Sequence, residues 1–154
     1  MDCLLIGGAP HTGKTTTIFR LYSLLLNRGF TIIHQEPTQI RAPLDNMRAV
    51  LQNPVNQRKL LLNSRSDYPG NGQELSSYYQ QHLPVDVIVT SIRDQGPERN
   101  GMDTAIATLA PSQTVEIPLA KVTRRINWNT AATDYWNSVE ALCMFILAGQ
   151  PFEL

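Results

Sequence analysis

The sequence carries no surplus of charge, because 13 basic side chains balance 13 acidic ones over 154 residues. A net charge of zero argues against a general nucleic-acid binder, which relies on a basic surface. Cysteine is also scarce, since only Cys3 and Cys143 occur, each within an apolar run. Two such thiols favour free, buried cysteines and exclude a disulfide scaffold.

The chain also lacks a long hydrophobic run and a targeting segment. The longest candidate for a membrane span, Ala141 to Gly149, is much shorter than the ~20 residues that such a helix needs. Met1 is followed by an apolar run and a glycine loop, and not by a basic region and a cleavage site. We therefore expect no membrane association and a cytoplasmic location.

Lysine is rare among the cations, because the 13 basic residues comprise 10 arginines and only 3 lysines. Arginine suits fixed, bidentate contacts to phosphate or carboxylate groups better than it suits a diffuse basic coat. The hydrophobic fraction of 42% is sufficient for a packed core, and the length fits one domain. We therefore expect a single domain over residues 1–154.

Apolar runs and helical periodicity alternate along the chain. Residues 3–6 predict a short buried strand, residues 16–28 have the apolar spacing of a helix, and residues 30–34 predict a second strand. A helix between two strands is the βαβ unit of a parallel sheet. Further strands are expected over 85–92 and 114–119, and further helices over 74–83, 102–109 and 131–148. The sequence thus predicts an α/β fold with a mostly parallel sheet of about four or five strands flanked by helices.

Residues 8–15 match the pattern G-x-x-x-x-G-K-[ST] at every fixed position. Glycines let backbone N–H groups surround a phosphate, and the helix that follows adds the positive end of its dipole. In this pattern Lys14 reaches the β- and γ-phosphates, and the Thr15 hydroxyl binds Mg²⁺. The residues expected to hold a nucleotide are Gly8, Ala9, Pro10, His11, Thr12, Gly13, Lys14, Thr15 and Thr16.

With an apolar strand before it and an amphipathic helix after it, this motif resembles the phosphate-binding loop of P-loop NTPases. The resemblance is specific over residues 1–36 and implies a three-layer P-loop fold that binds ATP, or another nucleoside triphosphate, with Mg²⁺. It is similar in particular to the opening of thymidylate kinases and related nucleoside and nucleotide kinases, because the second strand is followed by Glu36-Pro37. In that family a carboxylate at this strand end positions or deprotonates the acceptor, which makes Glu36 an acceptor-side candidate.

Many such kinases place their acceptor-binding helices where residues 38–83 fall. The pattern from 38 to about 62 is mixed and favours helix, and residues 63–73 are rich in turn formers. We therefore expect 38–83 to be a helical acceptor-binding or lid insertion. No Asp-Arg-Tyr-type motif follows residue 36, so the sequence does not identify the substrate.

A second metal ligand is expected from an acidic residue at the end of another strand. The strand 85–92 ends without a carboxylate at the usual place, which leaves Asp94, Glu36 or, through its hydroxyl or a water, Ser91. Thr15, Asp94 and Glu36 are therefore the candidate metal ligands.

Two arginines flank the loop that follows this strand. Arg93 and Arg99 are candidates for neutralising charge during phosphoryl transfer, and pairing with neighbouring acidic residues is the alternative for both. Arg124 and Arg125 follow the strand 114–119 and have the same two interpretations. The candidate catalytic residues are Lys14, Glu36, Asp94, Arg93 and Arg99.

The sequence is compatible with three functions. The first is Mg-ATP-dependent phosphoryl transfer to a small acceptor such as a nucleoside or nucleotide. The second is an NTP-hydrolysing switch, although no Asn-Lys-x-Asp motif occurs and Asp67-Tyr68-Pro69-Gly70, which matches D-x-x-G, follows no convincing strand. The third is a degenerate nucleotide-binding module with an interaction role. The expected partners are a nucleoside triphosphate and a small-molecule acceptor, and the sequence leaves the oligomeric state open.

Overall fold

The computed structural model describes residues 1–40, 46–122 and 128–154. Within these ranges, six strands form one mixed sheet: β1 (Asp2–Gly7), β2 (Thr31–Glu36), β3 (Arg48–Gln52), β4 (Lys59–Asn63), β5 (Val87–Ile92) and β6 (Thr114–Pro118). Their order across the sheet is β2-β3-β4-β5-β1-β6. β4, β5, β1 and β6 are parallel neighbours, whereas β3 is antiparallel to both β2 and β4. Because the direction reverses twice across β3, β2 runs the same way as β1.

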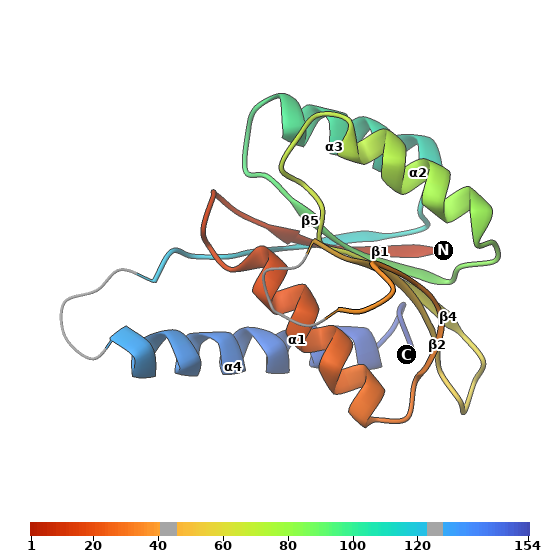
Figure 1. Cartoon of the computed structure of the whole chain (residues 1–154), viewed down its shortest axis with the longest axis horizontal. Coiled ribbons are helices and arrows are strands. Elements are labelled where there is room, and N and C mark those ends of the chain that lie inside the picture. Colours follow the sequence, from red (N-terminus) through yellow and green to blue (C-terminus); the bar gives the residue numbers. More distant parts are fainter. Residues whose placement is uncertain (41–45, 123–127) are drawn as a thin grey trace.

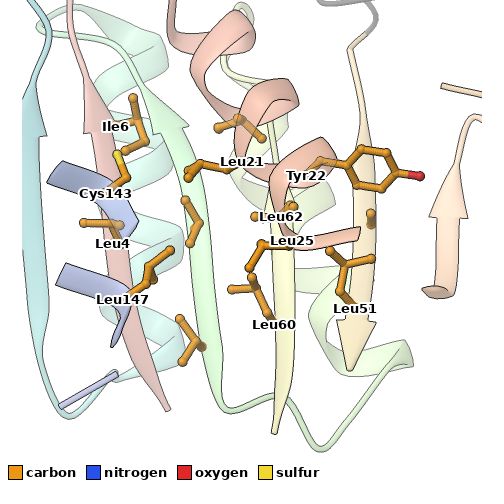
Figure 2. Close-up of a cluster of buried hydrophobic side chains, with 14 of the residues drawn as sticks. Leu4, Ile6, Leu21, Tyr22, Leu25, Leu51, Leu60, Leu62, Cys143 and Leu147 are labelled. Carbon is orange, nitrogen blue, oxygen red and sulfur yellow. The ribbon is translucent and has the colours of Figure 1, made fainter. Parts of the chain in front are cut away.

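Two helices cover each face of the sheet (Figure 1). α1 (Lys14–Asn27) and α4 (Trp128–Ala148) lie on one face, and α2 (Asn71–Gln81) and α3 (Pro97–Leu109) lie on the other. Alternate residues of β1 point to opposite faces, as the strand period requires. Figure 2 shows Leu4 and Ile6 facing Cys143 of α4. Cys3 and Leu5 belong to the core beneath α2 and α3.

Close packing of α2 on α3 depends on two glycines. A Cβ atom at Gly72 would lie 2.4 Å from the carbonyl oxygen of Gly101. A Cβ atom at Gly101 would lie 2.7 Å from the carbonyl oxygen of Pro69, in the loop that leads into α2. The absence of side chains at these two positions therefore sets the separation of α2, α3 and this loop.

The predicted α/β class is confirmed, but the helical prediction for part of the chain is wrong. The sheet has six strands where about four or five were expected, and it is mixed, with three parallel and two antiparallel pairings. Residues 48–52 and 59–63, within the stretch expected to be helical, form β3 and β4. Both strands are buried over most of their length, so their apolar residues run consecutively, and a short apolar run does not distinguish a buried strand from a helix.

The helices and strands that position the glycine loop are close to the predicted ones. β1, α1, β2, β5, β6 and α4 all overlap the stretches expected from periodicity, and α2 and α3 begin a few residues earlier than expected. Within the described ranges, no helix is both long and apolar enough to span a membrane.

Candidate functional site

The glycine loop, residues 8–13, connects the end of β1 to the start of α1. Gly8 and Gly13 have φ angles of 149° and 92°, which side-chain-bearing residues rarely adopt. Gly13 is the residue before the first turn of α1, so its conformation directs the start of the helix toward the loop. The amino end of α1 therefore presents its unpaired N–H groups and its positive dipole on this side of the sheet.

Lys14 folds back over the glycine loop. Its Nζ donates hydrogen bonds to the carbonyl oxygens of Gly8, at 2.7 Å, and of Ala9, at 2.9 Å. The Thr12 hydroxyl also donates to the carbonyl of Ala9, at 2.9 Å. Only 6% of Lys14 is exposed, and burial is the main cause that lowers the pKa of its ammonium group. The loop thus holds a desolvated cation whose hydrogen bonds go to neutral carbonyls.

An open cavity of about 460 Å³ lies over the glycine loop. Six of the residues expected to hold a nucleotide line it, together with Arg93 from the candidate catalytic set. Three further lining residues come from parts of the chain that the sequence did not connect with this loop. The residues that line the cavity are Pro10, His11, Gly13, Lys14, Thr15, Thr16, Asn46, Asp67, Arg93 and Trp136.

Arg93 and Asp67 form an ion pair at this cavity. Nη2 of Arg93 lies 2.8 Å from Oδ1 of Asp67, with the arginine side chain 18% exposed and the aspartate side chain 60% exposed. Arg93 follows β5 and Asp67 follows β4, and these strands are parallel neighbours, so their carboxyl ends reach the same edge of the sheet. The positive charge of Arg93 further lowers the pKa of Lys14, while Asp67 and Asp94 oppose that effect.

Asp67 is the functional candidate that the sequence reasoning did not select. Its D-x-x-G match was set aside because no convincing strand preceded it, yet β4 ends at Asn63, four residues before it. Identifying β4 from the sequence would have placed Asp67 at the carboxyl edge of the sheet. The signal was therefore present, but it depended on the strand that was mistaken for helix.

Asp94, Ser91 and Arg99 lie outside the lining of this cavity. Asp94 is exposed, and Ser91 is fully buried inside β5. The Arg99 guanidinium donates to Asp103 at 2.8 Å and to both oxygens of Glu116 at 2.9 and 3.0 Å. Hydrogen bonds to Glu116 and Asp103 raise the pKa of Arg99. The position of Arg99 therefore fits ion pairing, which was the alternative to a catalytic role.

Glu36 lies at the carboxyl edge of the sheet but far from the glycine loop. Three strands separate β2 from β1. With neighbouring strands about 4.8 Å apart, this order places the two strands roughly 19 Å apart across the sheet. The structure therefore does not bring Glu36 together with Lys14 and Thr15, contrary to the grouping proposed for the metal site.

Glu36 lines a second cavity of about 410 Å³, which we call the β2–α2 cavity. Arg48, with 11% of its side chain exposed, lies 3.0 Å from Glu36 and 3.4 Å from Glu74. Its guanidinium also lies over the Tyr78 ring, 5.1 Å from the centroid, the geometry of a cation–π contact. Burial, followed by the charge of Glu36, raises the pKa of Tyr78 to about 12. The remaining lining residues are Tyr68, Gly70, Gln73, Ser77 and Gln81.

The loop of residues 64–70 borders both cavities. Asp67 lines the glycine-loop cavity, whereas Tyr68 and Gly70 line the β2–α2 cavity. Consecutive Cα atoms are 3.8 Å apart, so the two cavities approach each other across this loop. The carboxyl edge of the sheet thus carries two neighbouring cavities, each lined in part by charged side chains.

Oxygen ligands suitable for Mg²⁺ are present at the glycine loop. The Thr15 hydroxyl and the Asp67 carboxylate both line the cavity, and Mg²⁺ commonly combines one or two protein oxygens with water and phosphate oxygens. Across the described ranges, no group of three or more His, Cys, Asp or Glu side chains is arranged to hold a metal by itself. Arg124 and Arg125 lie outside the described residues.

Comparison of the chain with protein-family models, with curated protein sequences and with solved structures finds no match.

Proposed function

We propose that this chain is a cytoplasmic P-loop phosphotransferase with the three-layer fold of that superfamily. It binds Mg-ATP, or another nucleoside triphosphate, over the glycine loop and transfers the terminal phosphoryl group to a small acceptor, a nucleoside or a nucleotide. The observation that carries this proposal is the convergence of Lys14, Arg93, Thr15 and Asp67 on one open cavity at the start of α1.

The chemistry of phosphoryl transfer fits these four side chains. The transition state spreads negative charge over the equatorial oxygens of the transferred group, and fixed cations stabilise that charge. Lys14 and Arg93 supply two cations, and incoming phosphate oxygens replace the loop carbonyls that Lys14 now contacts. Mg²⁺ would neutralise part of the phosphate charge, and Thr15 and Asp67 would provide the protein oxygens that hold it.

The β2–α2 cavity is the proposed acceptor site. It borders the glycine-loop cavity across the loop of residues 64–70 and combines two tyrosine rings with one arginine, which suits an acceptor that has both a ring and a polar group. Glu36 then acts on the distal part of the acceptor, and Asp67 is the carboxylate nearest the reacting phosphate. This division keeps Glu36 on the acceptor side and assigns the metal to Asp67.

The second candidate is an NTP-hydrolysing switch, and one observation favours it. Asp67, the first residue of the D-x-x-G match, follows β4 and lines the glycine-loop cavity, which is the position from which such a loop responds to the terminal phosphate. In that case the same loop transmits the presence of the phosphate to the β2–α2 cavity, which then contacts a partner.

Labelled ATP, Mg²⁺ and a panel of nucleosides and nucleotides distinguish the two candidates. A phosphorylated acceptor supports the kinase, whereas release of phosphate without any acceptor supports the switch. Lys14→Ala abolishes either activity if the loop holds the nucleotide, and Lys59→Ala, at the opposite end of the sheet, is the matched control. Wild-type turnover in the Lys14→Ala protein would refute the assignment of this loop.

A further inference from the structure

Trp136, on α4, lies directly against the glycine loop. It lines the glycine-loop cavity, and a Cβ atom built on Gly13 would come within 2.7 Å of the indole Nε1. The indole therefore occupies the space beside Gly13, at the start of α1. A larger residue at position 13 would need the same space. More than 120 residues of sequence separate the two, so the contact is produced by the packing of α4 on α1.

Several contacts hold this part of α4 in place. Arg20 of α1 binds Glu140 with a distance of 2.9 Å between Nε and Oε2, and it also donates a hydrogen bond to Asn137. Tyr135, the neighbour of Trp136, accepts a hydrogen bond from the Ala120 N–H at 2.7 Å. One turn further on, Val139 is buried in the core that α1 and α4 share. Trp136 is thus presented to the cavity from a fixed backbone.

We propose that Trp136 is the surface on which the nucleoside part of the bound nucleotide stacks. This inference rests on the proposed function, because it assumes that the glycine loop holds the phosphates. The loop, Lys14 and Arg93 provide charge and hydrogen bonds, which recognise phosphate groups and not a base. Trp136 supplies the largest aromatic ring of the cavity lining, and aromatic rings stack on nucleobases.

Stacking on Trp136 makes the site prefer a nucleoside triphosphate over bare tripolyphosphate. Every base has a π-face, so stacking on an indole tolerates adenine and guanine alike. The preference arises from the ring of the ligand and not from the polar edge of its base. ATP and GTP are therefore expected to bind with affinities within about threefold of each other, while tripolyphosphate binds about 10-fold or more weakly.

The test compares ligands with and without a base in a protein whose only tryptophan is Trp136. In a Trp128→Phe background, titration with Mg-ATP is expected to change the tryptophan fluorescence, and tripolyphosphate is expected to change it much less. Trp136→Leu in the same background weakens ATP binding about 10-fold and leaves tripolyphosphate binding unchanged, whereas Trp136→Phe retains most of the ATP affinity. Thermal unfolding of each variant shows whether it remains folded.

Two results would overturn this assignment. If Trp136→Leu weakens ATP and tripolyphosphate equally, the indole only supports the shape of the loop. If a folded Trp136→Leu protein binds ATP as tightly as its parent, the nucleoside does not contact this residue. Failure of the proposed function is distinguishable from both results. If the glycine loop holds no phosphates, the parent protein binds neither ligand and Lys14→Ala changes nothing; if the loop binds ATP without transferring a phosphoryl group, the binding measurements stand and only the acceptor assay fails.

Discussion

Replacing Arg93 by alanine separates the contribution of this residue to stability from its proposed contribution to phosphoryl transfer. The Arg93–Asp67 ion pair has a partner that is 60% exposed, and pairs screened by water to this extent contribute no more than about 1 kcal/mol. Loss of the packed arginine stem adds a further cost of up to about 2 kcal/mol, at about 0.8 kcal/mol for each buried CH₂ group. The free energy of unfolding should therefore fall by less than about 3 kcal/mol, which is below the usual stability of about 5–15 kcal/mol, so we expect the variant to stay folded.

The expected effect on turnover is larger. Removal of one preorganised group that stabilises transition-state charge commonly costs about 3 kcal/mol, which corresponds to a decrease of about 100-fold or more in kcat. Arg99→Ala is the matched control, because this arginine also follows β5 but is held by Asp103 and Glu116 outside the cavity. Its turnover should remain within a few fold of the wild-type value.

The Arg93→Ala protein should also show a higher pKa for Lys14, because the positive charge of Arg93 is one of the causes that lower it. A lowered pKa in the folded state means that the unfolded chain binds more protons between that pKa and 10.5, so stability rises with pH across this window. The rise should be smaller in the variant. NMR titration of the Lys14 side chain and chemical unfolding at several pH values measure both effects.

The reasoning about Arg93 would be refuted by a folded Arg93→Ala protein with wild-type kcat and nucleotide affinity. An unchanged Lys14 pKa in that variant would show that the two cations do not interact across the cavity.

Two further predictions concern the carboxylates and the thiols. Asp67→Asn should reduce Mg²⁺-dependent turnover about 100-fold and raise the Mg²⁺ concentration needed for half-maximal activity. Glu36→Gln should leave that concentration unchanged. The opposite pattern would assign the metal to Glu36. Burial raises the pKa of both Cys3 and Cys143 to about 12, so at pH 8 the native protein should not react with a thiol-specific disulfide reagent, and unfolding in denaturant should release two reactive thiols.

The sequence predicted the part of the fold that is encoded locally. The pattern of glycines, Lys14 and Thr15 between an apolar strand and an amphipathic helix identified the turn from β1 into α1, because each residue acts on its own neighbourhood. The position of Glu36 at the carboxyl end of β2 was also predicted correctly. The distance between Glu36 and the glycine loop was not predicted. It follows from the order of the strands in the sheet, and this order depends on pairing between distant segments.

Asp67 and Trp136 also reach the cavity through contacts that local sequence patterns do not encode. Asp67 enters the cavity because β4 pairs with β5, and β4 has a run of consecutive leucines that fits a buried helix equally well. Trp136 reaches the cavity although no local sequence pattern connects α4 with the glycine loop. Contacts between distant segments produce the site, and these contacts follow from packing.

The glycine pair between α2 and α3 also controls the space available to the loop that carries Asp67. Gly101 leaves room for the carbonyl of Pro69, and Pro69 stands two residues after Asp67 in the same loop. A methyl group added on α3, on the face of the sheet away from α1, would therefore press on the segment that carries the carboxylate into the cavity. A substitution at Gly101 is thus expected to displace Asp67, although α3 contributes no side chain to the lining of the cavity.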